Sequence, residues 1–227
     1  MKSLVTLSCF IVLVVASTAR AEGLRSFFNA DFYQNLRQSY GEPAERRAKK
    51  WQKLILKAQS DSEWNKANKI NDFFNENIQH QNDMPLWGEK DYWASPVETI
   101  GRGLGDCEDY AIAKFFSLRA LGISENKLRL MYVRQLTSNS PHMVLIYFEE
   151  PKAIPLVLDN FNSKILPANK RPDLKPIYSF NGEGLWMAEA TGAGRKIENS
   201  GGVSAWDQLL QRIESGSLPQ FGIDPAL

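Results

Sequence analysis

The feature that most constrains the fold is a glycine-punctuated turn followed at once by a long apolar segment. The turn spans residues 103–105, and residues 107–121 are mostly apolar or small. The apolar positions Ala111, Phe115 and Leu118 recur at i, i+4 and i+7. That spacing predicts one buried helical face, and Gly122 is typical of a residue that ends a helix. The segment therefore predicts a buried helix with Cys107 in its first turn.

The first 21 residues read as an export signal. Lys2 supplies a positive charge, residues 4–16 form an apolar stretch too short to cross a bilayer comfortably, and residues 19–21 form an A-x-A cleavage pattern. We expect cleavage before Glu22 and export of the mature protein to an oxidising compartment. An uncleaved N-terminal anchor helix is the alternative.

The composition limits the function classes. Among 227 residues, 27 Lys and Arg balance 26 Asp and Glu, so the net charge is +1. This balance argues against nucleic acid as the main partner, because phosphate binding needs an excess of basic residues. Residues 22–227 suit a single domain, and none of their segments is apolar enough to predict an integral membrane protein.

The mature chain is expected to keep one cysteine. Cys9 lies within the predicted signal, so Cys107 has no intramolecular disulfide partner. A free cysteine is often an inert core residue. At a helix N-terminus, however, the dipole favours a thiolate, and the unpaired backbone N–H groups can donate to an oxyanion. Cys107 is therefore a candidate nucleophile.

A nucleophilic thiol needs a base and a group that orients it. His142 opens an apolar run typical of a strand, whereas His80 stands in a polar, turn-like stretch and is expected at the surface. A second short apolar strand, residues 155–158, ends at Asp159 and Asn160. Asp159 is the preferred orienting residue and Asn160 the second choice. Taken singly, each residue also has a structural explanation, as a buried histidine or a turn after a strand.

The rest of the chain predicts a scaffold. Helices are expected over residues 43–58, after an S-x-x-E capping pattern at 60–63, and from a cap at Ser204. Residues 128–134 alternate with period two and predict a strand before the one that holds His142. Helices and consecutive strands together indicate the α+β class.

Three segments then suggest a family. Residues 105–111, with the sequence GDCEDYA, the helix end at 118–122 and the block YWASPVE at 92–98 resemble the bacterial transglutaminase-like cysteine proteinases, in particular their periplasmic adhesin proteases. The resemblance covers about residues 25–215.

The resemblance implies a papain-like α+β fold, with N-terminal helices and the nucleophile at the start of a central helix packed on a small antiparallel sheet. It implies a catalytic triad of Cys107, His142 and Asp159 and dependence on Ca²⁺. It also implies a large repeat adhesin as the substrate, cut in its N-terminal region to release cells from biofilm, and an inner-membrane cyclic di-GMP receptor as the regulator.

An acidic cluster surrounds the candidate nucleophile. Asp106, Glu108 and Asp109 lie within two positions of Cys107, and their charge opposes formation of a thiolate. A bound Ca²⁺ would offset that charge, although acids in a first turn also simply complement the helix dipole. With the resemblance, Asp106 and Glu108 are the best candidate ligands and Asp109 a weaker one. Zinc is disfavoured, because one cysteine and two distant histidines do not form its usual ligand set.

Two other functions remain open. An acyltransferase would form the same thioester and resolve it with an amine instead of water. A non-catalytic binding module could keep the fold, although it would have no need for an exposed thiol beside a histidine.

Overall fold

The computed structural model describes residues 22–188, 194–197 and 202–215. The helices are α2 (Ala30–Tyr40), α3 (Glu42–Lys57), α4 (Glu63–Asn77), α5 (Asp83–Trp87), α6 (Pro96–Arg102), α7 (Cys107–Ala120) and α8 (Ser204–Glu214). The strands are β1 (Gln79–His80), β2 (Leu104–Gly105), β3 (Leu128–Gln135), β4 (Ser140–Tyr147), β5 (Leu156–Leu158), β6 (Leu166–Pro167), β7 (Leu174–Asn181), β8 (Gly184–Met187) and β9 (Arg195–Lys196). The predicted export signal lies outside the described residues and stays a prediction. Among the helices that the structure describes, none has the length and apolar character needed to cross a membrane.

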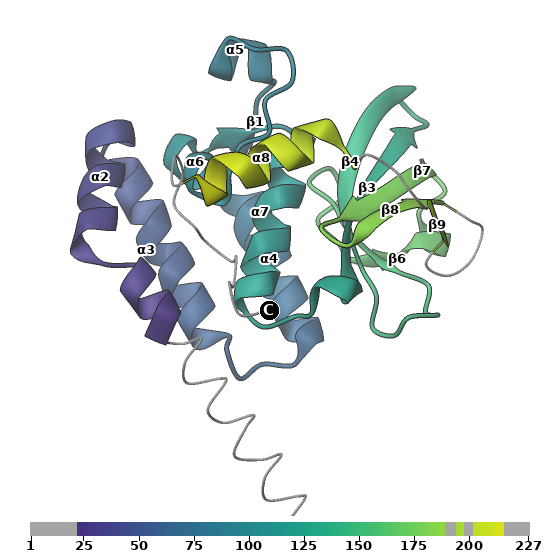
Figure 1. The fold of residues 1–227 in the computed structure, drawn as a ribbon, viewed down its shortest axis with the longest axis horizontal. Coiled ribbons are helices and arrows are strands. Elements are labelled where there is room, and N and C mark those ends of the chain that lie inside the picture. Colours follow the sequence, from purple (N-terminus) through teal and green to yellow (C-terminus); the bar gives the residue numbers. More distant parts are fainter. Residues whose placement is uncertain (1–21, 189–193, 198–201, 216–227) are drawn as a thin grey trace, which may run out of the picture.

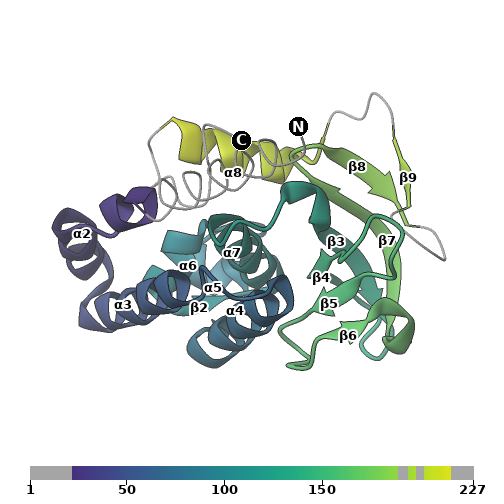
Figure 2. The ribbon, with the colours of Figure 1, turned by 90° about the horizontal axis from the view of Figure 1, so that it is seen from below.

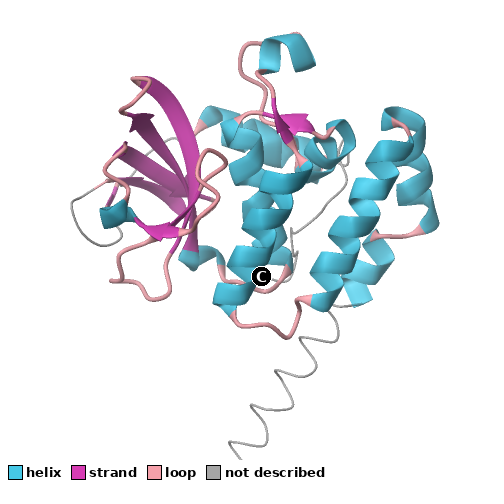
Figure 3. Ribbon diagram, turned by 180° about the vertical axis from the view of Figure 1, so that it is seen from behind, coloured by secondary structure: helices cyan, strands magenta, loops and turns pink. Residues whose placement is uncertain are grey.

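Helices occupy one side of the molecule and the main sheet the other (Figures 1 and 3). The sheet is antiparallel throughout, with strand order β6-β5-β4-β3-β7-β8-β9, and a separate parallel pair joins β1 to β2. Helix α7 packs against α4 and α6 on one side and against β4 and β3 on the other. This arrangement confirms the predicted α+β fold, with a central helix that begins at Cys107 and packs on an antiparallel sheet.

Local sequence explains the outer helices. The buried side chains of α3, among them Trp51 and Ile55, share one face, and its lysines are exposed. Helix α4 begins one residue after Ser62, whose side chain accepts a hydrogen bond from the Asn65 N–H at 3.3 Å. The prediction that the S-x-x-E pattern at 60–63 caps this helix was therefore wrong. Ser62 fits better because its own backbone is extended, as an N-cap requires.

Strand β4 is buried on both faces. Its side chains Met143, Leu145 and Tyr147 join the large core beneath α7, while Val144 and Ile146 face a smaller cluster on the opposite side of the sheet. This burial explains why the segment reads as a continuous apolar run instead of an alternating one. The first residues of the strand, including His142, thus lie beside the N-terminal end of α7, where Cys107 stands.

Helix α8 closes the molecule over α7 and the sheet (Figure 2). Its Trp206 stacks on Phe116 of α7 and meets Phe180 of β7 edge-on, with ring centroids 5.6 and 6.0 Å away. Ser204 is the first helical residue, and Val203 is the N-cap, without a side-chain hydrogen bond. The predicted serine cap was therefore wrong by one position.

Candidate active site

Cys107 is the first residue of α7, as the sequence predicted. The turn that leads to it uses Gly103 with φ 68°, a conformation that favours glycine. At Gly105 a Cβ atom would come within 2.7 Å of Oδ2 of Asp109, so the close approach of turn and helix also requires glycine. Strand β2, which holds Gly105, pairs with β1, and this pairing fixes the direction in which the chain enters α7.

The Cys107 sulfur lies between the acidic turn and the start of β4. It is 2.9 Å from Oε2 of Glu108 and also receives a hydrogen bond from the backbone N–H of Met143, the residue after His142. Burial raises the pKa of the thiol, and the charges of Glu108 and Asp106 raise it further, while the Met143 N–H lowers it. The side chain is thus placed beside the histidine strand, but burial and then the acidic cluster favour its thiol form.

His142 and Asp159, two members of the candidate triad, are in direct contact. Nε2 of His142 lies 2.8 Å from Oδ1 of Asp159, and the two side chains are 1% and 0% exposed. Because this contact occupies Nε2, the other ring nitrogen, Nδ1, is the one that can accept a proton from a thiol. Asn160, the alternative orienting residue, makes no such contact with the imidazole; its Oδ1 is buried without a hydrogen-bond partner.

Asp159 is held as an anion. Burial alone would raise its pKa, but hydrogen bonds and charge from His142, the backbone N–H of Phe161 and the Arg171 guanidinium lower it to about 2. Arg171 donates from Nη2 to Oδ2 at 2.7 Å, and the Phe161 N–H donates to Oδ1 at 3.0 Å. Such a carboxylate keeps an imidazole in one tautomer and stabilises its charged form.

An aromatic side chain covers the histidine. The Phe161 ring stacks on His142, with centroids 4.6 Å apart and an angle of 12° between the planes. The same ring meets His80 edge-on at 5.5 Å. His80 is exposed, as predicted, but it stands at the edge of the site and not remote from it.

The acidic cluster is larger than the sequence indicated. Three groups of possible ligand atoms can be defined, and within each group the atoms lie within 4.8 Å of one another. Together the groups include five acidic residues and the Cys107 sulfur. The five are Asp83, Asp91, Asp106, Glu108 and Asp109. Asp83 begins α5, which protrudes from the body of the molecule in Figure 1. Asp91 follows α5 in the chain, and its carboxylate lies near those of Asp83 and Glu108. The segment from Asp83 to Asp91 therefore brings two further carboxylates to the first turn of α7.

The cluster carries more negative charge than it can hold unpaired. Burial, followed by charges including those of its acidic neighbours, raises the pKa of Asp106 to about 10 and that of Asp83 to about 6. One buried oxygen on each, Oδ1, has no hydrogen-bond partner. Crowded carboxylates with orphaned oxygens and no nitrogen ligand suit a hard cation such as Ca²⁺. The residues present thus fit the metal that the sequence suggested.

Asp109 has an additional role. Its Oδ1 accepts from the Ala94 N–H at 2.8 Å, and its Oδ2 accepts from the Asp106 N–H at 3.4 Å. Both oxygens are therefore used to join the segment before α6 to the start of α7. Asp109 is the least available ligand of the three predicted from sequence.

Sequence reasoning missed Asp83, Asp91, Arg171 and Phe161. The first two stand in a polar stretch with no ligand spacing, and the last two lie in connecting segments after β5. One signal could have found Phe161. It follows the candidate orienting residue Asp159 by two positions, so it had to lie near the site.

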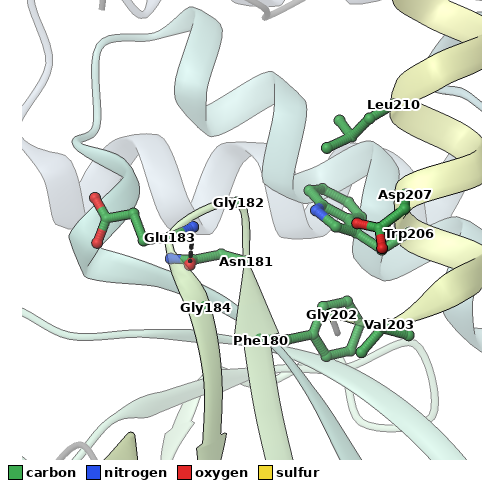
Figure 4. Close-up of a pocket in the computed structure, with 10 residues that line it drawn as sticks. All are labelled: Phe180, Asn181, Gly182, Glu183, Gly184, Gly202, Val203, Trp206, Asp207 and Leu210. Atoms are coloured by element: carbon green, nitrogen blue, oxygen red, sulfur yellow. Dashed lines mark hydrogen bonds between the residues drawn. The ribbon is translucent and has the colours of Figure 1, made fainter. Parts of the chain in front are cut away.

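A separate cavity lies between the turn joining β7 to β8 and the start of α8 (Figure 4). It has a volume of about 220 Å³, and its lining includes Phe180, Glu183, Trp206 and Asp207. None of the candidate catalytic or metal residues lines it. It is therefore distinct from the site around Cys107.

A thiol at a helix start, an imidazole–carboxylate pair on the adjoining strands and a papain-like arrangement together define the class of cysteine peptidases. The sequence model of the bacterial transglutaminase-like cysteine proteinases matches residues 33–175, and the chain belongs to this family. A comparison with curated protein sequences gives no match.

Solved structures of LapG from Legionella pneumophila are similar to the chain along most of its length. Calcium-bound LapG is 43% identical, covers 80% of this chain and 97% of its own, and superimposes with a TM-score of 0.69. A second LapG structure is 42% identical with a TM-score of 0.68, over 80% of this chain and 95% of its own. EGTA-treated LapG is 41% identical with a TM-score of 0.68 and the same coverage.

Proposed function

We propose that this chain is a calcium-dependent periplasmic cysteine endopeptidase with a triad of Cys107, His142 and Asp159. The observation that supports the triad best is the buried His142–Asp159 hydrogen bond beside the strand residue whose N–H contacts the Cys107 sulfur. Membership of the family supports peptide-bond hydrolysis. Calcium is supported by the acidic cluster and by the calcium-bound state of the similar LapG.

In this mechanism, Nδ1 of His142 takes the proton of the Cys107 thiol, and the sulfur attacks the substrate carbonyl carbon. The backbone N–H of Cys107, at the start of α7, donates to the oxyanion. His142 then protonates the leaving amine, and a water molecule activated by His142 hydrolyses the thioester. Asp159 stabilises the imidazolium in both steps. Bound Ca²⁺ would be held by Asp83, Asp106 and Glu108, and its positive charge would favour the thiolate over the thiol.

A substrate-independent experiment tests the pair of Cys107 and His142. The rate of alkylation by iodoacetamide is measured against pH, with calcium present, for the wild type and for His142→Ala and His80→Ala. We expect fast alkylation near neutral pH only where His142 is present, because the imidazole removes the thiol proton. A wild-type rate profile like that of free cysteine would contradict the triad.

The substrate proposal is an adhesin of the same cell, cut in its N-terminal region. In a strain whose chromosomal copy carries Cys107→Ala, we expect one very large surface protein to stay attached and uncut while the wild type releases it. New N-termini in the culture medium, identified by terminal labelling, locate the cut. An unchanged set of released proteins would contradict this substrate and leave the triad untouched.

The same strains test localisation and regulation. The mature protein should be recovered from the periplasm with Glu22 as its first residue. We further propose an inner-membrane cyclic di-GMP receptor that withholds the protease, so a raised cyclic di-GMP level should reduce adhesin release. Adhesin release that does not change with the cyclic di-GMP level would contradict regulation by such a receptor.

Hydrolysis is separated from acyl transfer by adding a fluorescent primary amine to the reaction. Free new termini support the peptidase, and amine incorporated at the cut supports the acyltransferase. Loss of both products in Cys107→Ala would confirm that either outcome depends on the thiol.

A further inference from the structure

The loop that follows β5 bears on the candidate histidine at two places. Asp159 begins the loop, and Phe161 within it stacks on the His142 ring. A shift of this short segment would therefore alter both the hydrogen bond and the ring that covers the imidazole. The contacts that hold the loop decide how well the histidine is placed.

Two asparagine amides of α4 hold the two ends of the loop. Nδ2 of Asn75 donates to the backbone carbonyl of Asp159 at 2.8 Å, and Nδ2 of Asn71 donates to the carbonyl of Ser163, also at 2.8 Å. The two asparagines are four positions apart, so they stand on the same face of the helix. The spacing of one helical turn therefore sets the span of the loop.

Lys114 fixes the orientation of the Asn71 amide. Its Nζ donates to Oδ1 of Asn71 at 2.9 Å. An ammonium group has no acceptor, so it binds only the oxygen end of the amide and turns the nitrogen end towards Ser163. Lys114 lies on α7 seven positions after Cys107, which is about two turns further along the same face.

Burial of this lysine is costly. Lys114 is 0% exposed, and burial lowers its pKa to about 7, although the charges of Asp159 and Asp72 act in the opposite direction. An uncharged side chain of similar length would avoid the desolvation penalty. A residue that is unfavourable for stability and connected to the site by a chain of hydrogen bonds fits a role in placing the site.

We propose that Lys114 and Asn71 are positioning residues that hold the loop after β5, so that Phe161 covers His142 while Asp159 orients it. This inference rests on the proposed function for the role of His142, but the placement itself can be measured without any substrate. Phe161 makes that measurement possible, because its ring contacts both His142 and His80, and the chain has 2 histidines.

The test is a proton–carbon NMR spectrum of the histidine rings in the chain from residue 22, with any affinity tag removed. Phe161→Leu gives the signal positions that result when the ring current is lost. We expect Lys114→Met and Asn71→Ala to move the His142 signal in the same direction, by at least about half of that shift. Asn68→Ala is the matched control, since its amide donates to the Trp64 carbonyl within α4 and not to the loop after β5.

Asn71→Asp separates positioning from stability. The new carboxylate keeps an acceptor for Lys114 and forms an ion pair with it, but it can no longer donate to Ser163. We expect a folded protein with a displaced His142 signal, and about a tenfold lower kcat with KM within about twofold. Histidine signals at wild-type positions in folded Asn71→Asp and Lys114→Met would overturn the proposal. A failure of the proposed function would instead show as activity that survives in Cys107→Ala. The displacement of the His142 signal in Lys114→Met and Asn71→Ala would still be seen in that case.

Discussion

Nε2 of His142 and Oδ1 of Asp159 lie 2.8 Å apart in a part of the core that water does not reach. Arg171 neutralises the second oxygen of the same carboxylate, so the pair is held within a network of charge. The hydrogen bond leaves one defined ring nitrogen for chemistry. It also makes Asp159 the residue whose removal should be visible in both activity and stability.

Replacement of Asp159 by asparagine should reduce kcat by about 10²- to 10⁴-fold, because the imidazolium loses its counter-charge. It should also change the response to acid. The folded pKa of Asp159 is about 2, below its usual 3.8, so its contribution to stability is present above pH 3.8 and is lost as the pH falls towards 2. Denaturant titrations between pH 2 and 5 should show a smaller loss in the variant, by about 2 kcal/mol.

Replacement of Cys107 by alanine should abolish peptide cleavage and leave the fold intact. The variant loses the proposed nucleophile and with it the thioester, whereas a partly buried sulfur contributes little to packing. We expect a melting temperature at or above that of the wild type, since the thiol no longer lies against Glu108. Residual cleavage above about 1% of the wild-type rate would contradict the nucleophile assignment.

The two histidines should differ sharply on replacement by alanine. Loss of His142 should abolish cleavage, because this residue directly precedes Met143, whose N–H contacts the Cys107 sulfur, and its imidazole is the group proposed to take the thiol proton. Loss of His80 should change kcat by less than about threefold, since its ring touches only the edge of Phe161 among the contacts described. Steady-state kinetics of both variants with one peptide substrate check this. The reverse ranking would refute the role assigned to His142.

The parts of the site that follow from local pattern were predictable. Glycine spacing and helical periodicity placed Cys107 at the start of α7. Apolar runs placed His142 near the start of one strand and Asp159 at the end of the next. Each of these signals is contained within about fifteen consecutive residues. The cap at Ser60 was wrong because a second serine, Ser62, lies two residues further on and accepts the capping hydrogen bond. The cap at Ser204 was wrong because the N-cap is the apolar Val203, which no capping pattern marks.

The rest of the site depends on tertiary packing. Asp83 and Asp91 reach the first turn of α7 because the chain leaves the body through α5 and returns, and the sequence has no periodic signal for such an excursion. Lysine is seldom fully buried, yet Lys114 is, because α4 covers it with Asn71. Both are cases in which a neighbouring element overrides the expected exposure of a charged residue.

Lys114→Met should change how stability responds to alkaline pH. The folded pKa of Lys114 is about 7, lowered from 10.5, so its charge costs stability below pH 7 and the cost is relieved as the pH rises towards 10.5. The methionine variant should lack this gain. Between pH 6.5 and pH 9, the free energy of unfolding of the wild type should therefore rise relative to that of the variant. Equal differences would mean that the ammonium is better solvated than its burial indicates.

Calcium binding should be coupled to proton release from the acidic cluster. Asp83 and Asp106 have folded pKa values of about 6 and about 10, both raised from 3.8. Without metal, their contribution to stability is present below pH 3.8 and is lost as the pH rises through those values. Calcium binds the deprotonated carboxylates and so offsets the loss of stability that rising pH causes. The increase in melting temperature on adding Ca²⁺ to chelator-treated protein should therefore be larger at pH 8 than at pH 5.

Magnesium should stabilise the protein less, because it keeps its waters and requires an octahedral shell. Asp83→Asn and Glu108→Gln should each weaken the calcium response at least about tenfold in metal concentration, since each loses a charged ligand. Asp31→Asn, which alters an exposed acid in the first turn of α2, is the matched control and should keep the full response. Peptide cleavage should follow the same calcium titration, because the metal charge favours the Cys107 thiolate. A melting temperature and a cleavage rate that both ignore calcium and chelator would exclude the metal site and leave the triad standing.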